Sequence, residues 1–269
     1  MITTVTTKPK DGRFFTLGPD VAEEKILMVG SCRSNAYLNY FDRYNRMIGS
    51  RMKITFIEPN DFHWNEAGEW QDLDTALTRA EGDARLMQTL REATVFVHEH
   101  FVSFGMFNTD ITQPNHIYRH GLNARVDISI PNYHDRFILF NDLMAFDQEF
   151  KARVEGEGGV PGEGTIELLR CMGHAAIKGF QGACLKSSIP EFAEHFAENW
   201  TKTRFFWNCN HVSRHFTMYV LRRMNEKFLH WDLNDEFWAG AETEDLFANP
   251  HTLLTEHDVA AHGITWSEI

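Results

Sequence analysis

Cysteine, long apolar runs and positive charge are all scarce in this chain of 269 residues. Its four cysteines are Cys32, Cys171, Cys184 and Cys209. None of them forms a CxxC pair, which argues against a zinc site or a disulfide framework and predicts free thiols in a reducing, cytoplasmic compartment. The first twenty residues are polar and contain no apolar core, so we expect no signal peptide, and no later run is long enough to predict a membrane span.

Acidic residues outnumber basic ones by 38 to 26, which gives a formal net charge of −12. Because nucleic-acid binding draws on clustered lysines and arginines, we expect no nucleic-acid partner. A local basic pocket for a phosphate or carboxylate is compatible with this charge, since arginine suits such ligands. Two groups of arginines lie close in sequence: Arg119, Arg125 and Arg136, and Arg204 and Arg214.

The chain is 43% apolar, enough to bury a full core without disulfides or metals. Short apolar runs at 26–29, 52–57 and 94–97 alternate with helical patterns at 33–47 and 72–93. This alternation predicts an α/β fold with a parallel sheet flanked by helices. We expect a single α/β domain over 1–269, in which residues 105–188 form an irregular or mainly helical insertion or cap.

Two later segments have patterns that predict secondary structure. Residues 204–207 are typical of a late core strand, and the pattern after them predicts a helix from His211 to Phe228. Near the end of the chain, Thr255 and Asp258 have the spacing of a capping box, and Gly263 is placed to end that short helix.

The first strand ends at Gly30 and passes through Ser31 and Cys32 toward a helix. Unpaired N–H groups at a helix start lower the pKa of a thiol and stabilise an oxyanion, so this position suits a cysteine nucleophile. The same residues are also consistent with an ordinary turn between a strand and a helix, in which Ser31 is the N-cap and Cys32 is a small buried residue. Both interpretations stay open from the sequence.

A second strand-to-helix step brings a histidine to the same edge of the expected sheet. It reads Asn208-Cys-Asn-His211, and His211 is a candidate base for the Cys32 thiol, with Asn208 or Asn210 orienting the imidazole. Alternatively, the two asparagines cap the helix and His211 lies on its surface.

Together, Gly-Ser-Cys after a strand and a late Asn-x-x-His before a C-terminal helix resemble SGNH/GDSL hydrolases, in which Gly-Asp-Ser and Asp-x-x-His supply nucleophile and base. The Gly-x-Cys start, the middle segment and the helix after Asn-His are similar to the WcbI-like polysaccharide-biosynthesis enzymes. This resemblance implies an SGNH-like, flavodoxin-like three-layer core, binding of coenzyme A or acetyl-CoA, and acyl transfer. Asparagine replaces the orienting aspartate here, a loss that a thiolate–imidazolium pair tolerates better than a serine does.

The resemblance also suggests further site residues. Gly105 and Asn108 are approximate counterparts of the family's oxyanion donors, although a surface turn explains them equally well. Ser31 and Arg33 are further expected oxyanion or substrate residues, and the amides of Cys32 and Arg33 are the expected donors to the oxyanion. If coenzyme A binds, its phosphates would meet basic residues, for which the candidates are Arg33, Arg119 and Arg136.

We therefore expect an acyltransferase or esterase that works on a small molecule or a carbohydrate through a Cys32 thioester. One alternative is a non-catalytic member of the same fold that binds a carbohydrate or a protein through an aromatic-lined cleft. Another is a metal-dependent hydrolase built on His98 and His100, which alternate onto one face of a continued strand. Only these two ligands have a fixed spacing and no HExxH is present, so we expect no metal.

Overall fold

The computed structural model describes residues 14–31, 34–58, 62, 65, 67–99, 122–131, 138–208, 211–242 and 254–266. Their contacts divide into two compact units. The sheet unit contains the described residues of 1–130 and 224–238, and the helical unit contains those of 131–223 and 239–269. Within these ranges, no helix combines the length and the hydropathy needed to cross a membrane.

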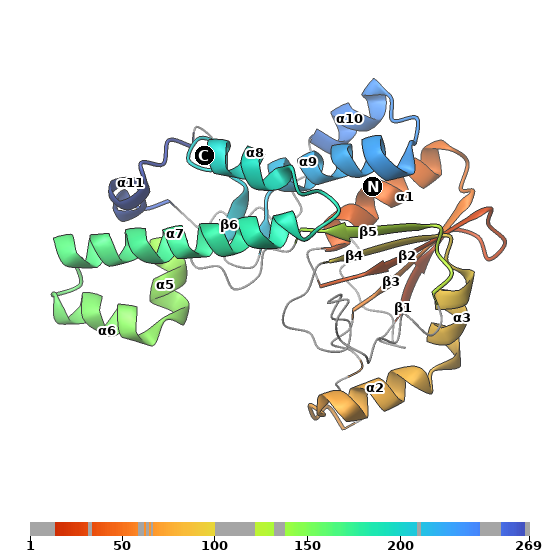
Figure 1. The fold of residues 1–269 in the computed structure, drawn as a ribbon, viewed down its shortest axis with the longest axis horizontal. Coiled ribbons are helices and arrows are strands. Elements are labelled where there is room, and N and C mark those ends of the chain that lie inside the picture. The colour runs from red at the N-terminus through yellow and green to blue at the C-terminus, as the bar shows by residue number, and fades with distance from the viewer. Residues whose placement is uncertain are drawn as a thin grey trace. The chain divides into compact units, whose positions relative to one another are not determined.

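The sheet unit is built on five strands, shown in Figure 1: β1 (Phe14–Leu17), β2 (Glu24–Val29), β3 (Met52–Ile57), β4 (Val95–Glu99) and β5 (Val126–Ile130). Their order in space is β1-β3-β2-β4-β5. Strands β2 to β5 run parallel, and β1 pairs antiparallel with β3. The predicted α/β class with a parallel sheet is confirmed, and β1 is an edge strand that the sequence pattern did not indicate.

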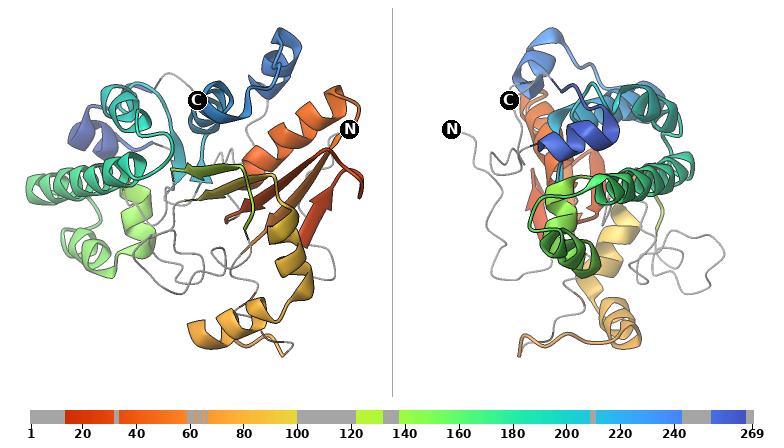
Figure 2. Two further views of the ribbon diagram at one scale, coloured as in Figure 1. Left: turned by 45° about the vertical axis from the view of Figure 1, so that its right-hand side comes forward. Right: turned by 90° about the vertical axis from the view of Figure 1, so that its left-hand side faces the viewer.

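Strand β2 lies at the centre of the sheet, between β3 and β4. Its residues 26–29 are each at most 1% exposed, because helices cover both faces of a parallel sheet and every position then needs an apolar side chain. Helix α1 (Asn35–Met47) covers one face, and α2 (Leu73–Glu81) and α3 (Ala84–Glu92) cover the other (Figures 1 and 2). The sheet unit therefore has three layers.

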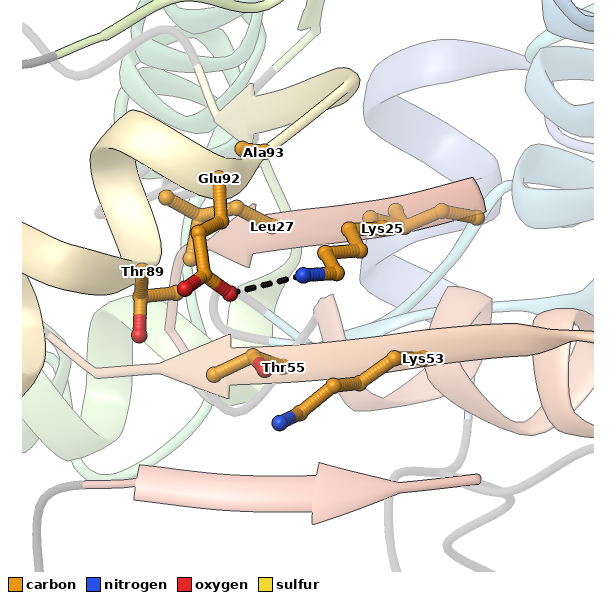
Figure 3. A pocket seen from close by; sticks show the side chains of 8 residues that line it. Lys25, Leu27, Lys53, Thr55, Thr89, Glu92 and Ala93 are labelled. Carbon is orange, nitrogen blue, oxygen red and sulfur yellow. Dashed lines mark hydrogen bonds and ion pairs between the residues drawn. The ribbon is translucent and has the colours of Figure 1, made fainter. Parts of the chain in front are cut away.

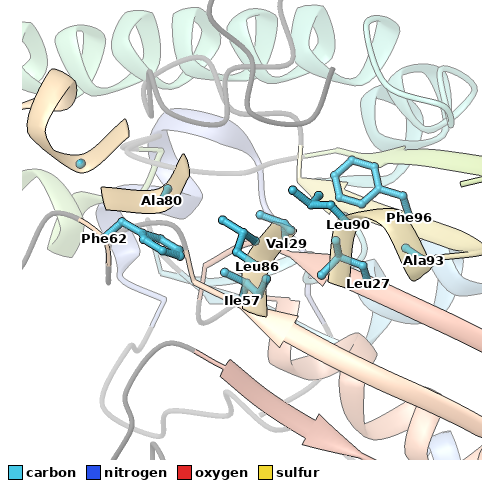
Figure 4. Packing of buried hydrophobic residues seen from close by; sticks show 10 residues of the cluster. Leu27, Val29, Ile57, Phe62, Ala80, Leu86, Leu90, Ala93 and Phe96 are labelled. Carbon is cyan, nitrogen blue, oxygen red and sulfur yellow. The ribbon is translucent and has the colours of Figure 1, made fainter. Parts of the chain in front are cut away.

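The face beneath α2 and α3 holds an apolar cluster in which Leu27, Val29 and Ile57 of the strands meet Leu86 and Leu90 of α3 (Figure 4). The sequence predicted one helix over 72–93, and two are found. The Asp83 carboxylate accepts the backbone N–H groups of Arg85 and Leu86, each at 3.0 Å, and so starts a new helix after Gly82.

On the opposite face, the ring of Trp231 stacks on Tyr44 of α1 at 4.5 Å and meets the edge of Phe41 at 4.8 Å, measured between ring centroids. Trp231 follows a short π-helix, η4 (Asn225–Leu229), and precedes α10 (Asp235–Glu242). The Asn225 side chain holds the Trp231 backbone at both its N–H and its carbonyl oxygen. This late segment therefore completes the α1 layer of the sheet unit.

The helical unit is organised around one long helix, α7, which packs against α6, α8 and α11. Its elements are α5 (Phe140–Phe146), α6 (Gln148–Gly156), α7 (Glu163–Leu185), α8 (Phe192–Asn199), β6 (Phe206–Asn208), β7 (His211–Val212), α9 (Arg214–Met224) and α11 (Glu256–His262). Phe180 of α7 packs its ring against Phe192, Phe196 and Phe206. This aromatic cluster forms one part of the core of the unit, and a second cluster includes Leu143, Phe150 and Leu169. The described part of the expected insertion, 105–188, supplies β5 to the sheet and α5 to α7.

The expected helix from His211 to Phe228 is wrong at its start, whereas at its end α9 continues directly into η4, which ends at Leu229. His211 lies on the two-residue strand β7, where it is the register partner of Asn208, and α9 begins at Arg214. Ser213 lies between strand and helix, with its N–H donating to the Phe205 carbonyl oxygen at 2.9 Å. By contrast, the Thr255–Asp258 capping box and the left-handed Gly263 at the end of α11 are confirmed.

Candidate functional site

The connections of the sheet reverse direction between β2 and β4. The chain leaves β2 for β3 on one side and then crosses back to β4 on the other side. In open α/β sheets, ligands bind beyond the carboxyl ends of the strands at such a switch point. Here Gly30 and Ser31 directly follow β2, and Glu99 is the last residue of β4. These residues define the candidate site.

Glu99 is a buried carboxylate, with 2% of its surface exposed. The Ser31 hydroxyl donates to its two oxygens, at 3.1 Å to Oε1 and 3.0 Å to Oε2, and the Ser34 hydroxyl donates to Oε1 at 2.5 Å. The backbone N–H of Ser34 also donates to the Ser31 carbonyl oxygen at 2.9 Å. One carboxylate from β4 thus holds both ends of the segment that carries residues 32 and 33.

Gly30 makes this arrangement possible. A Cβ atom at this position would lie 2.0 Å from Ser34 Oγ, 2.8 Å from Ser34 Cβ and 3.0 Å from Glu99 Oε1. Any larger residue would push Ser34 away from the carboxylate. The glycine at the end of the first strand is therefore required by close approach of the helix start.

Helix α1 begins directly after this contact. Ser34 occupies its N-cap position, but its hydroxyl donates to Glu99 and makes no capping hydrogen bond to the helix. The alternative interpretation of this turn, with Ser31 as the N-cap of the helix, is therefore wrong, because Ser34 occupies that position and Ser31 donates its hydroxyl to Glu99. A first helical turn whose N-cap side chain is engaged elsewhere offers its N–H groups and its dipole to another acceptor.

Tyr37 lies one turn further along α1, on the same side of the helix as Ser34. It is 2% exposed, and within the described part of the chain its Oη has no hydrogen-bond partner. Burial, and to a smaller extent the negative charge of Glu99 and the nearby Tyr40, raises the pKa of Tyr37 well above its usual range. Tyr37 is thus a neutral phenol with an unused donor close to the site.

His98 precedes Glu99 and therefore lies on the other face of the sheet. Its ring stacks on Phe96 at 4.8 Å, its Nε2 is 3.0 Å from Asp127 Oδ1, and its Nδ1 is 3.4 Å from the Glu99 carbonyl oxygen. Both ring nitrogens are thus engaged within the sheet. In the ranges that the structure describes, no three His, Cys, Asp or Glu side chains come together as a metal site.

The predicted base belongs to the helical unit. His211 is half-buried on β7, and Asn208 faces it across the β6–β7 pair as its register partner. The other predicted site residues lie outside the described residues: Cys32, Arg33, His100, Gly105, Asn108, Arg119, Arg136 and Asn210. Of the residues expected near the nucleophile, the structure brings Ser31 into a defined site, and the pairing of Cys32 with His211 stays a prediction.

A shallow pocket of about 280 Å³, partly open to solvent, lies at the opposite, amino edge of the same strands (Figure 3). Its two ammonium groups are paired: Lys25 Nζ lies 2.8 Å from Glu92 Oε2, and Lys53 Nζ lies 3.1 Å from Asp20 Oδ1. The hydrogen bond from Lys25, followed by one from Gln88, lowers the pKa of the Glu92 carboxyl. Because its charges are already satisfied and it lies away from the switch point, this pocket is not the candidate site.

Comparison with models of protein families, with curated proteins and with solved structures finds no match for this chain. The resemblance to SGNH-type and WcbI-like enzymes therefore rests on the residues that carry it.

Sequence reasoning missed Glu99 as a site residue. Its signal was present as a single carboxylate at the end of the apolar run of β4, a position where a charged side chain needs partners if it is buried. Glu99 lies between His98 and His100, whose alternation suggested metal ligands instead. The contact itself depends on β4 pairing beside β2, which no local pattern encodes.

Proposed function

We propose that this chain is an acyl-transfer enzyme whose nucleophile is Cys32. One observation carries the proposal: the buried Glu99 carboxylate binds Ser31 and Ser34, which flank Cys32 and Arg33 in the sequence, at the switch point of the sheet. Burying a carboxylate is costly unless hydrogen bonds compensate it, and a plain connection between a strand and a helix needs no such group. A segment anchored in this way at the ligand-binding edge supports a catalytic role for the residues that it carries.

In the first step, the Cys32 sulfur attacks the carbonyl carbon of an acyl thioester while His211 takes the thiol proton. The new carbon–sulfur bond forms, the bond from that carbon to the donor's sulfur breaks, and the donor leaves with the proton from His211. The oxyanion that develops between these events needs donors, for which we propose the amides of Cys32 and Arg33 together with Gly105 and Asn108.

In the second step, an acceptor oxygen attacks the acyl group on Cys32. The carbon–oxygen bond forms, the carbon–sulfur bond to Cys32 breaks, and the acceptor's proton passes through His211 to the sulfur. Asn208 is the proposed orienting partner of His211. A carbohydrate hydroxyl as acceptor gives transfer, and water gives hydrolysis.

The resemblance to SGNH-like and WcbI-like enzymes leads us to propose acyl-coenzyme A as the donor. Its phosphates need cationic partners, and Arg33, Arg119 and Arg136 are the proposed ones. We also propose a cytoplasmic setting, in which a reducing environment keeps Cys32 as a thiol.

Selective alkylation tests the nucleophile. Iodoacetamide at neutral pH, followed by peptide mass mapping, is expected to modify Cys32 faster than the exposed Cys171, which is the internal control for accessibility. Cys32→Ala is expected to abolish release of coenzyme A from acetyl-CoA, and Cys171→Ala to leave it unchanged. Turnover that survives Cys32→Ala would remove the proposal and favour a binding protein or a different catalytic group.

The base is tested in the same assay. His211→Ala is expected to slow turnover at least 100-fold and to slow alkylation of Cys32 near neutral pH, whereas His215→Ala on α9 is the matched control. Binding of the donor is measured separately by calorimetry with coenzyme A on the Cys32→Ser variant. The absence of heat at millimolar ligand would exclude coenzyme A and leave other thioesters open.

A further inference from the structure

We infer that Glu99 is a positioning residue of the proposed reaction: through the Ser31 and Ser34 hydroxyls, its negative charge fixes both ends of the segment that carries the nucleophile. This inference rests on the proposed function, because it assigns Glu99 a role in the work of Cys32. Glu99 does not itself touch the reacting atoms in this scheme. It acts through the two serines.

The hydrogen-bond pattern supports a role for the charge and not only for the shape of the side chain. Ser31 donates to both carboxylate oxygens, and Ser34 donates to one of them at the short distance of 2.5 Å. Hydrogen bonds to an ionised acceptor are shorter and stronger than bonds between neutral groups. A neutral amide of the same shape would hold the segment less firmly.

The surroundings of Glu99 are consistent with this task. Gly30 leaves the space that Ser34 occupies beside the carboxylate, and β4 pairs with the central strand β2 over residues 95–98. The carboxylate is therefore mounted on a strand that is paired on both sides, while the segment that it holds joins the sheet to the start of α1. Catalytic groups held on a rigid scaffold keep their geometry, and misplacement by about 1 Å can cost about 100-fold in rate.

A negative charge at this place has a second, opposing consequence for Cys32. Cys32 follows Ser31 directly, and a nearby like charge disfavours ionisation of a thiol. Removing the charge is thus expected to make the thiol ionise at lower pH while making the enzyme slower. Glu99→Asp, which keeps the charge, separates this effect from a simple loosening of the fold.

The experiment compares Glu99→Gln with Glu99→Asp and with Glu92→Gln, which removes one negative charge at the amino edge of the same sheet. For Glu99→Gln, we expect kcat to fall about 10- to 100-fold with KM changed less than about threefold. We also expect the pH midpoint of Cys32 alkylation to move down by about 0.5 to 1 unit. Glu99→Asp keeps the charge and is expected to recover part of kcat and the original midpoint, and Glu92→Gln to change neither.

A double-mutant cycle tests whether Glu99 acts through Ser34. Ser34→Ala is expected to lower kcat in the wild-type background and to have a smaller effect in the Glu99→Gln background, because the contact is already weakened there. Urea unfolding of each variant establishes that it is folded under assay conditions.

The outcomes separate this inference from the proposed function. If Cys32→Ala abolishes turnover but Glu99→Gln keeps both kcat and the alkylation midpoint, the positioning role is overturned and the acyl-transfer proposal stands. If Cys32→Ala retains turnover, the acyl-transfer proposal fails and the role of Glu99 fails with it. If kcat falls in Glu99→Gln while the midpoint stays or rises, Glu99 is only a structural residue.

Discussion

The Asp258 carboxylate accepts the backbone N–H of Phe140 at 2.7 Å, and so caps a helix that begins 118 residues earlier in the chain. Asp258 belongs to α11, where its other oxygen accepts both the N–H and the hydroxyl of Thr255. Leu139, the N-cap residue of α5, has no side chain that can cap a helix. One buried carboxylate therefore serves the starts of two helices and joins the C-terminal segment to the helical unit.

Asp258→Ala is expected to destabilise the protein by about 2–4 kcal/mol, because it removes two caps and leaves buried N–H groups unpaired. The control is Asp147→Ala, which removes the single cap of α6 at Phe150 and is expected to cost about 1 kcal/mol. Urea unfolding monitored by circular dichroism gives both values. Equal losses for the two variants would contradict the double role of Asp258.

Gly30→Ala is expected to destabilise the protein by about 1–3 kcal/mol, since the added methyl group would overlap Ser34 and displace it from Glu99. Gly182, inside α7, has open space around the position of a Cβ atom, and Gly182→Ala is expected to stabilise the protein by about 0.5–1 kcal/mol. Thermal unfolding measures the change in stability of each variant, and the two changes are expected to have opposite signs. A neutral or stabilising Gly30→Ala would show that the approach of Ser34 is not tight.

His262 makes the stability of the helical unit depend on pH. Its Nε2–H donates to the Ile138 carbonyl oxygen at 3.1 Å, and its buried Nδ1 has no partner within the described residues. Burial is the largest cause that lowers the pKa of His262. The unfolded chain therefore binds more protons than the folded chain once the pH falls below the ordinary histidine value of about 6.5.

Stability is thus fully present above about pH 6.5 and is lost as the pH falls toward the lowered pKa of the folded state. His262→Gln keeps a donor for Ile138 and cannot be protonated, so the difference in unfolding free energy between wild type and variant should decrease from pH 8 to pH 5. His195 also has a lowered pKa, caused mainly by burial, but it is present in both proteins and cancels in this difference. A difference independent of pH would exclude His262 as the titrating group.

The Lys25–Glu92 ion pair contributes little to stability, because its side chains are 29% and 38% exposed. Glu92→Gln is expected to cost less than about 1 kcal/mol at low salt, and this cost should disappear in 1 M NaCl, where charges are screened within about 3 Å. Since pairing lowers the pKa of Glu92, its contribution is present above about pH 4 and is lost as the pH falls further. A large cost that persists in high salt would mean that packing, and not charge, holds this edge.

The sequence predicted the parallel strands and several helix ends because their signals are local. The apolar run before Gly30, the helical stripe of α3 and the Thr255–Asp258 box each use residues within a few positions of one another. The prediction failed where a single residue or a distant contact decides the backbone. The apolar pattern predicted one continuous helix, but Asp83 caps a new helix and so divides it. Ser213 lies outside the expected helix because its backbone N–H donates to the carbonyl oxygen of Phe205.

By itself, the sequence determined that an α/β sheet forms and that a Gly-Ser-Cys-Arg-Ser segment joins its central strand to a helix. Only the tertiary structure decided that Glu99 receives the two serine hydroxyls of this segment. Strand order places β4 beside β2, and this order is set by how the intervening helices pack over the sheet, not by any short-range preference. A contact between residues 31 and 99 becomes visible only after that packing has been made, because a lone carboxylate in the sequence does not show whether it will be buried or which hydroxyls it will meet.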